Sequence, residues 1–436
     1  MTRTRIATLG TAAVALALAL AGCSEAGQSG SASGDGEDAG IGGTITVLTN
    51  RTDLVDTLFA DYKSQFEQKY PGTDVEFESI TDYEGEVTTR MNTDQYGDVL
   101  IIPTTIKVSD YANYFEPLGT ADELSASYNY LSGYVHDGQV YAIPDNAGVN
   151  GVLYNKKVWQ TAGITELPRT PDEFVNDLKQ IKAKTDAIPY YTNYAAGWPL
   201  SQWEGLRGAI SGSAEAANHL TEIDAPWAPG EEHYVLDSML YDLVADGLVE
   251  QDPTTTDWEL SKQMMADGEI ATMVLGSWSI VQVASVADDA QDIAYMPFPN
   301  EVDGKFYVPI AADGPQAVNV HSTNKATARA WIDFMAGESG YAQSQDLIPT
   351  QVGADFPDSL KSLQSDNVEF LQLNPAPAGM EGLLDSIDNG AEIGLWDPTY
   401  RQNIVDTARG QVKGDKQSIF DDLDSRWAAA RAKVQG

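Results

Sequence analysis

TITVLT at residues 44–49 and DVLII at residues 98–102 bound the stretch of chain that decides the fold. In the first segment polar and apolar residues alternate, which predicts a strand with one buried face. The second segment is a continuous apolar run closed by Pro103, which is typical of a buried parallel strand. A further strand is predicted between them, over residues 74–79.

Two helices are predicted to connect these strands. From Leu54 to Phe66 the apolar residues fall on one helical face, and Pro71-Gly72 ends that pattern. A second helix is predicted over residues 84–92. The order strand, helix, strand, helix, strand indicates an α/β domain whose strands run parallel.

Further along the chain, helix and strand patterns continue to alternate. Thr170, Pro171 and Glu173 predict a helix start. Threonine can cap, proline suits the first turn, and a glutamate three residues after the cap completes a capping box. The other predicted elements are strands over residues 271–275 and 317–320, and helices over residues 323–337 and 416–434.

The N-terminus predicts an exported protein. Arg3 and Arg5 precede an apolar run that ends in Leu-Ala-Gly-Cys, and Cys23 is the only cysteine in the 436 residues. A basic start, an apolar stretch and small residues at its end are typical of a secretory signal. The ending resembles the lipobox of bacterial lipoproteins, so we expect residues 1–22 to be a removed signal peptide and Cys23 to be lipidated. The alternative is a small buried thiol.

Residues 23–43 are expected to form the lipidated cysteine and a flexible tether. The segment is mostly Gly, Ser, Ala and acidic residues, and such a composition cannot bury enough apolar surface to fold. Two or more acyl chains anchor a protein stably. The expected location is therefore the extracytoplasmic face of the cell membrane, with the lipid as the sole contact with that membrane.

The charge of the chain limits its partners. The formal net charge is −39, and loss of Arg3 and Arg5 with the signal peptide would change it from −39 to −41. Such a charge argues against binding to nucleic acid or to anionic lipid head groups. Once Cys23 is lipidated no thiol remains, which excludes disulfides, thiol catalysis and cysteine-ligated metals. We expect neither a cofactor nor a metal site, because the four histidines are not at metal-binding spacing.

Several motifs, in order along the chain, resemble a known family. They are Tyr-Ala-Ile-Pro at 141–144, Leu-Tyr-Asn-Lys-Lys at 153–157, Thr-Pro-Asp-Glu-Phe at 170–174, the segment 267–278, and GPQAVNVHSTN at 314–324. Together they look like the extracellular solute-binding proteins of ABC importers, in the branch that includes maltose- and other sugar-binding proteins. The resemblance spans residues 44–436, although Pro171 stands where the family usually has tryptophan.

The resemblance implies an α/β fold of two lobes, with a ligand cleft between them that closes over the solute. The chain should cross between the lobes near residues 146–151 and 310–313, and again near 360–370. The expected N-terminal lobe comprises residues 44–147 and 312–362, and the expected C-terminal lobe comprises residues 148–311 and 363–436.

The resemblance also implies a function. The chain would be a monomeric solute-binding component of an ABC importer that captures a carbohydrate, expected to be an oligosaccharide, and delivers it to permease subunits and their ATPase. It would not be an enzyme. The alternative is a lipid-anchored glycoside hydrolase, which needs two carboxylates about 5–10 Å apart. A structural surface protein should show internal repeats, and the sequence shows none.

Aromatic side chains are the first group of candidate ligand contacts, because they can stack on the apolar face of a sugar ring. Trp278 follows a predicted strand, and the matching tryptophan of the family stacks on sugar; the alternative is a structural tryptophan between the lobes. The other candidates are Tyr194, Trp198, Trp203 and Trp396, each of which could instead pack under its own loop.

Polar side chains at strand ends and crossings form the second group. In open α/β sheets, ligands bind beyond the carboxyl ends of the strands. The candidates are Asn50, Arg51, Asp53, Thr104, Asn146 and Asp313. Asp53 has an alternative role as a helix cap, and the crossing residues, which include Asp145, could instead satisfy turn backbone.

Overall fold

The computed structural model describes residues 40–377 and 379–435 of the 436-residue chain. The predicted signal peptide, Cys23 and residues 24–39 of the predicted tether lie outside the described residues. Within the described part, no helix combines the length and the apolar character needed to cross a membrane.

The first three strands form the predicted parallel sheet. β1 (Gly43–Thr49) pairs in parallel with β2 (Thr73–Ser79) and with β3 (Val99–Ile101). α1 (Leu58–Lys69) connects β1 to β2, and α2 (Tyr83–Arg90) connects β2 to β3.

The predicted start of the first helix at Leu54 is wrong. Residues 54–57 form a turn in which the Leu54 carbonyl accepts hydrogen bonds from the backbone N–H groups of Thr57 and Phe59. The apolar pattern continued across this turn, so it did not mark where the helix begins.

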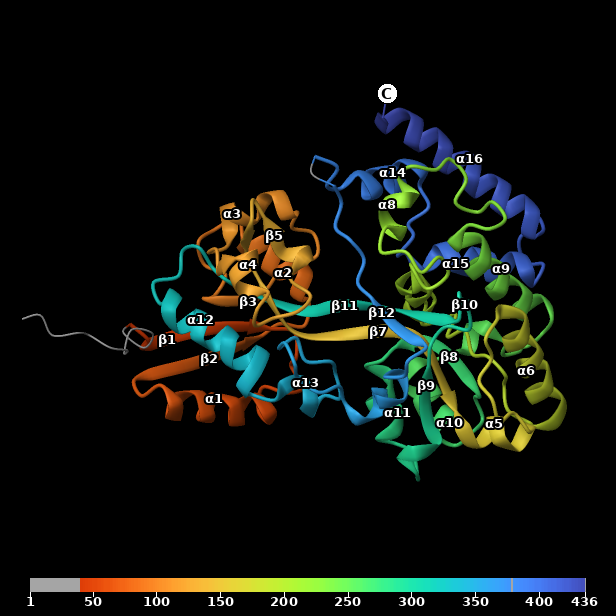
Figure 1. The fold of residues 1–436 in the computed structure, drawn as a ribbon, viewed down its shortest axis with the longest axis horizontal. Helices are drawn as coiled ribbons and strands as arrows, with labels where there is room; N and C mark the ends of the chain where they lie inside the picture. The colour runs from red at the N-terminus through yellow and green to blue at the C-terminus, as the bar shows by residue number, and fades with distance from the viewer. Residues whose placement is uncertain (1–39, 378, 436) are drawn as a thin grey trace, which may run out of the picture. The chain divides into compact units, whose positions relative to one another are not determined.

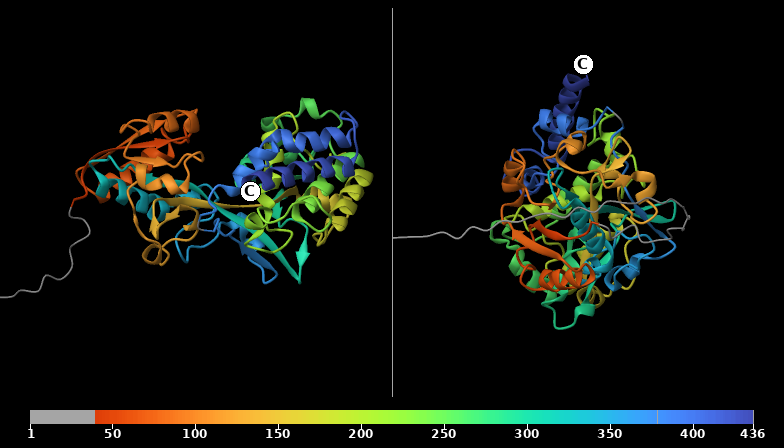
Figure 2. Two further views of the ribbon diagram at one scale, coloured as in Figure 1. Left: turned by 90° about the horizontal axis from the view of Figure 1, so that it is seen from above. Right: turned by 90° about the vertical axis from the view of Figure 1, so that its left-hand side faces the viewer.

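Two long strands connect this sheet to the rest of the protein. β7 (Ile143–Asn155) and β11 (Lys305–Val318) pair antiparallel, and the strand order of the sheet is β2-β1-β3-β11-β7-β8. Figure 1 shows these strands running from a first lobe, which holds β1–β3, α1, α2 and α12 (Lys325–Asp333), into a second lobe. The second lobe holds β8 (Thr272–Gly276) and β9 (Ile293–Met296), both paired with β7. The two lobes are also seen from above in Figure 2.

The remaining elements complete the two lobes. Short segments near the first lobe are α3 (Tyr111–Tyr114), α4 (Ala121–Leu124), α13 (Tyr341–Ser344) and a small sheet of β4 (Gly119–Thr120), β5 (Val135–His136) and β6 (Gln139–Val140). The second lobe carries α5 (Lys156–Ala162), α6 (Pro171–Lys184), α7 (Trp198–Ser201), α8 (Ala216–Leu220), α9 (Glu232–Ala245), α10 (Trp258–Ala266), α11 (Ser279–Ala284), α14 (Leu383–Ala391), α15 (Pro398–Ala408) and α16 (Lys416–Gln435). β10 (Glu301–Val302) and β12 (Val368–Leu371) pair with β11.

The predicted start of α6 is confirmed, with one change. The Thr170 hydroxyl oxygen accepts a hydrogen bond from the Glu173 N–H at 3.2 Å, and Pro171 is the first helical residue. The Glu173 carboxylate accepts from the N–H of Arg169 at 2.7 Å, the residue before the cap. In a capping box the Glu173 carboxylate would accept from the backbone N–H of Thr170, the cap residue. Here it accepts from the preceding residue instead.

Other predicted boundaries also differ from the structure. Of the strand expected over residues 317–320, only residues 317–318 are strand, as the last part of β11, whose earlier residues include Pro309 and Pro315 and so lack a continuous strand pattern. The helix expected over residues 323–337 is α12, which passes into a π-helical turn at Phe334–Glu338.

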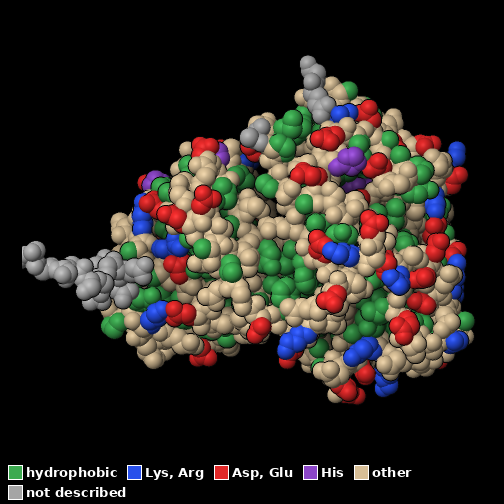
Figure 3. Space-filling model, viewed as in Figure 1, with side chains coloured by type: hydrophobic (Ala, Val, Ile, Leu, Met, Phe, Trp, Pro, Cys, Tyr) green, Lys and Arg blue, Asp and Glu red, His purple; other side chains and the backbone are tan. Residues whose placement is uncertain are grey.

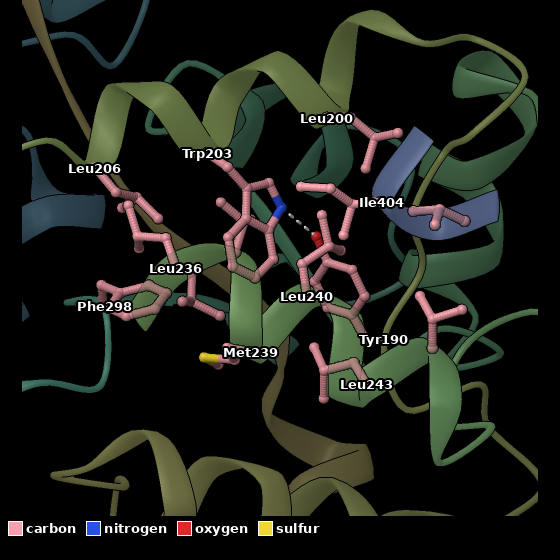
Figure 4. Packing of buried hydrophobic residues seen from close by; sticks show 14 of the residues in the cluster. Tyr190, Leu200, Trp203, Leu206, Leu236, Met239, Leu240, Leu243, Phe298 and Ile404 are labelled. Carbon is pink, nitrogen blue, oxygen red and sulfur yellow. Dashed lines mark hydrogen bonds between the residues drawn. The ribbon is translucent and has the colours of Figure 1, made fainter. Parts of the chain in front are cut away.

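Apolar side chains of α6, α7, α9 and α15 form the core of the second lobe. Figure 4 shows Trp203 in the middle of this core, with its indole N–H donated to the Tyr190 hydroxyl at 2.8 Å. Acidic side chains are instead spread over the face of the molecule seen in Figure 3.

A buried ion cluster lies beside this core. Arg401 of α15 bonds to Glu204 and to Asp237 of α9, each at 3.0 Å, and all three side chains are at most 1% exposed. His233 and Arg207 also contact Glu204. Because burial of charge is tolerated only with such partners, Arg401 fixes α15 to α9 and to the segment that carries Glu204.

Replacement of Arg401 by methionine should strongly destabilise the second lobe. Glu204 would lose one of its cationic partners and Asp237 its ion-pair partner, and breaking a buried pair costs about 3–5 kcal/mol. Urea unfolding followed by tryptophan fluorescence measures this change. The matched control is Arg90→Met, because Arg90 pairs with Glu78 and Glu86, which are 44% and 47% exposed; it should cost about 1 kcal/mol or less. Equal effects of the two variants would contradict the expectation.

Candidate functional site

The paired strands β7 and β11 have one covered face and one open face. In an antiparallel pair, directly opposed residues lie on the same face. Asn146 is opposite Asp313, and Gly148 is opposite Ala311. Ala147 and Val149, the alternate residues of β7, are fully buried in an apolar cluster that also holds residues of the 348–363 segment. We call the side of Asn146, Gly148, Asn150, Ala311 and Asp313 the open face.

A first pocket, of about 190 Å³, lies where β1 ends beside these strands. It brings together five of the predicted site residues from four separate parts of the chain. These are Asn50, Arg51, Asn146, Trp278 and Asp313. Asp145, Gln316 and Tyr341 also line it. The carboxyl ends of β1 and β8 therefore meet at one site, as the strand-end argument predicts.

A second pocket, of about 380 Å³, adjoins the open face further along the strands. Asn150 and Ala311 form part of its wall, together with Tyr130, Glu204 and Arg207. Trp396 also lines it, and at 56% exposure this ring has a large free surface. Both pockets therefore include residues of the open face.

Three tryptophans from three segments pack together beside the first pocket, and one of them, Trp278, lines it. Trp278 lies with its ring centre 5.5 Å from that of Trp198 and 5.6 Å from that of Trp258, and the last two are 5.3 Å apart. Trp198 and Trp258 thus hold the Trp278 ring in place, while Trp278 itself lines the pocket.

Five predicted residues are not among the residues that line either pocket, and one of them, Trp198, packs against Trp278. Trp203 is fully buried in the core with its N–H already bonded, so its prediction as a ligand contact is wrong in this structure. Tyr194 donates its hydroxyl to Asp406 at 2.8 Å. Thr104 is exposed and bonds to Glu84. Asp53 is also exposed and pairs with Arg51, so it is neither a helix cap nor a pocket residue.

The charges of the first pocket favour a neutral ligand. Among the described residues that line it, Arg51 is the only one with a cationic side chain. Its guanidinium already donates to Asp53, to the Tyr341 hydroxyl at 3.0 Å and to Gln345 at 3.1 Å. Hydrogen-bonded partners raise its pKa further, although burial opposes this. Asp145 and Asp313 would repel an anion, so hydroxyl and amide chemistry suits the site better than phosphate or carboxylate.

A larger pocket, of about 540 Å³, lies over α8 and the start of α9. It is lined by four glutamates, Glu215, Glu222, Glu231 and Glu232, and by none of the predicted site residues. Among residues 40–377 and 379–435, no group of three or more His, Cys, Asp or Glu side chains could hold a metal ion. We therefore place the candidate site at the strand ends.

Gln316, Tyr341 and Trp258 were missed by the sequence argument. Gln316 follows the second crossing and Trp258 follows a capping aspartate, but neither position carries a local pattern that points to a pocket. Their roles arise from contacts between distant segments, such as the bond from Arg51 to Tyr341.

Known proteins resemble this chain over most of its length. Residues 49–342, more than half of the chain, match the family described as bacterial extracellular solute-binding protein. The diacetylchitobiose binding protein DasA of Streptomyces coelicolor is 34% identical over 227 residues, a match that covers 49% of this chain and 49% of DasA. The chain thus aligns with about half the length of that relative.

Two solved structures from Bifidobacterium animalis subsp. lactis share the two-lobed fold. BlMnBP1, a binding protein of an ABC transporter in complex with mannobiose, is 35% identical with a TM-score of 0.81. BlMnBP2, described as manno-oligosaccharide specific and solved with mannotriose, is 33% identical with a TM-score of 0.81. Each match covers 91% of this chain and 96% of the other. The predicted two-lobed α/β fold is confirmed.

The place of the Trp278 ring can be tested through Gly276. A Cβ atom at residue 276 would lie 2.4 Å from Trp278 Nε1, too close for the ring to stay where it is. Gly276→Ala should therefore displace Trp278 and change the near-ultraviolet circular dichroism of the tryptophans. Gly42→Ala is the matched control, because its nearest contact would be an ordinary 3.8 Å. An unchanged spectrum for Gly276→Ala would mean that the ring is placed differently.

Proposed function

Because the chain belongs to the bacterial extracellular solute-binding protein family, we propose that it captures a neutral oligosaccharide outside the cytoplasm and delivers it to an ABC importer. The single observation that carries this proposal is the first pocket, where Trp278 offers an aromatic face beside amide and carboxylate groups. Sugars need this combination, because they present hydroxyls at the edge and C–H groups on the face.

We propose manno-oligosaccharides as the ligand class. Two structural relatives with at least 33% identity over 91% of this chain were solved with mannobiose or mannotriose. The diacetylchitobiose binding protein is similar over a shorter segment, so chitobiose-type sugars are the second candidate. The second pocket, with exposed Trp396, would receive a further sugar ring.

The residues proposed to contact ligand are those that line the two pockets. In the first pocket they are Asn50, Asn146, Trp278 and Asp313. Arg51 is proposed to stabilise the pocket wall through its hydrogen bond to the Tyr341 hydroxyl. Trp396 is proposed for the second pocket. Trp198 packs against Trp278, and Tyr194, Thr104, Asp53 and Trp203 are left out.

Closure of the two lobes would trap the ligand, as in other binding proteins of this kind. We propose that the lobes are divided as the sequence suggests, with residues 44–147 and 312–362 in one and the rest of the folded chain in the other. β7 pairs with β11 over residues 143–149 and with β8 from residue 150, so its partner changes near the proposed first crossing. Permease subunits with their ATPase would receive the sugar from a monomer.

We also propose that Cys23 carries the lipid anchor after removal of residues 1–22. The support is the Leu-Ala-Gly-Cys ending behind two arginines, together with a family of extracellular proteins. An anchor of this kind would keep the protein near the importer. We propose binding without turnover, because the family is one of solute-binding proteins rather than glycoside hydrolases.

Trp278→Ala should weaken binding of mannobiose by about 1–3 kcal/mol, which is the usual cost of losing a buried aromatic contact. Isothermal titration calorimetry of residues 40–436 against mannobiose, mannotriose, diacetylchitobiose and raffinose measures this change. Trp278→Phe is the control, since it keeps an aromatic face and should bind better than the alanine variant. Full affinity in a folded Trp278→Ala protein would remove this residue from the site.

Chromatography of each sugar after incubation should recover it unchanged. Release of mannose from mannobiose would favour the hydrolase alternative, while failure of every sugar in the panel to bind would contradict capture of oligosaccharides.

Cys23→Ser should release the full-length protein from the membrane fraction of the expressing bacterium, because the acylated thiol would be lost. Cell fractionation followed by immunoblotting measures this release. Ser24→Ala is the matched control and should leave the protein with the membranes. Retention of the Cys23→Ser protein in that fraction would mean that another segment anchors it.

A further inference from the structure

A buried acid with two amide partners lies in the wall of the first pocket. Asp145 Oδ1 accepts a hydrogen bond from Asn146 Nδ2 at 2.6 Å, and Oδ2 accepts from Gln316 Nε2 at 3.0 Å. All three side chains are at most 7% exposed, and all three line the pocket. Gly314 makes room for the acid, because a Cβ atom there would lie 2.3 Å from Asp145 Oδ1.

Both amides keep an oxygen with no partner. Among the described residues, Asn146 Oδ1 and Gln316 Oε1 are buried and have no hydrogen-bond donor. A buried acceptor without a donor costs about 1–3 kcal/mol, and buried polar groups in native proteins are nearly always satisfied. Two such atoms in the wall of one pocket indicate that something in the pocket donates to them.

We propose that Asp145 is a positioning residue that turns both amide oxygens toward the pocket, where they accept hydrogen bonds from hydroxyl groups of the bound sugar. An ionised carboxylate can only accept hydrogen bonds, so each neighbouring amide must present its NH₂ group to Asp145. The oxygen of each amide is thereby left for the ligand. This inference deepens the proposed function and rests on it.

The same arrangement defines the chemistry of the ligand. Two acceptors require two O–H or N–H donors at matching positions, which a polyhydroxylated ring supplies. An anionic ligand is disfavoured, because Asp145 and Asp313 line the pocket and Arg51 is already paired. A purely apolar ligand would leave both oxygens unsatisfied.

The ionisation of Asp145 connects this arrangement to pH. Burial raises its pKa to about 7, although the hydrogen bonds from Gln316 and Asn146 oppose the rise. The charged and titratable groups around it are Asp313 on β11, Arg51 after β1, Tyr341 on α13 and Tyr134.

Below that pH the protonated acid carries its own O–H donor, and one amide must turn its oxygen toward the acid. That oxygen is then lost to the ligand. Affinity should therefore be highest above pH 7 and fall as the pH drops below it, by up to about tenfold per pH unit.

The first experiment measures the affinity for mannotriose at pH 5.5, 7.0 and 8.5 by calorimetry. Wild-type affinity should fall at least tenfold between pH 8.5 and 5.5. Asp145→Asn should bind about tenfold more weakly than wild type at pH 8.5 and show no such fall. Asp177→Asn is the control, because burial also raises the pKa of Asp177, to about 6, and it lines none of the pockets described above; its pH profile should match that of wild type.

The second experiment needs no ligand. The side-chain amide signals of Asn146 and Gln316 in ¹⁵N-labelled protein should shift with a midpoint near pH 7, and Asp145→Asn should abolish the shift. Unchanged amide signals between pH 5.5 and 8.5 would overturn the inference whatever the protein binds. If no sugar of the panel binds while the amides titrate, the proposed ligand is wrong and the positioning role of Asp145 stands.

If Asp145→Asn does not fold, Gln316→Met tests the same inference, because it removes one amide and keeps a side chain of similar shape. Its affinity for mannotriose at pH 8.5 should also be about tenfold lower than that of wild type. Wild-type affinity in either folded variant would overturn the inference.

Discussion

The antiparallel pairing of β7 with β11 is the constraint on which the rest of the structure depends. These strands continue the parallel sheet of the first lobe and also pair with β8 of the second lobe. One face of the pair is covered by apolar residues, so its register is fixed, because a slip of one residue would bury the polar side chains of the other face. The register therefore places Asn146 opposite Asp313, and both side chains line the first pocket.

The site is built from strand ends and needs little movement of its own parts. Asn50 follows β1, Trp278 follows β8, and Asn146 lies on β7. Each side chain is held by its neighbours: Trp198 and Trp258 pack on Trp278, and Asp145 bonds to Asn146. Such support from a second layer of residues is what keeps a binding geometry within tight limits. The proposed closure would then move the lobes as whole bodies.

The sequence predicted the architecture better than the individual contacts. The alternation of TITVLT, the segment 74–79 and the apolar run before Pro103 identified the three parallel strands, because these patterns are local. Strand ends correctly indicated Asn50 and Trp278 as neighbours in space. Trp203 was misassigned, because a tryptophan near a loop has the same local sequence whether it turns outward or into the core. Gln316 and Tyr341 could not be found, since only the paired strands bring them to the pocket.

The unpaired amide oxygens also show why stability and binding conflict at this site. Replacing Asp145, Asn146 and Gln316 together by apolar residues of similar shape would remove two buried oxygens that lack a partner, and replacing hydrogen-bonded partners together can be nearly neutral or stabilising. The pocket instead retains both amides beside a buried acid, which is costly unless a ligand supplies the missing donors. Polar groups that are costly in the empty protein favour the bound state, because the ligand regains that free energy when it donates to them. A site with satisfied walls would be more stable when empty and would bind sugar less tightly.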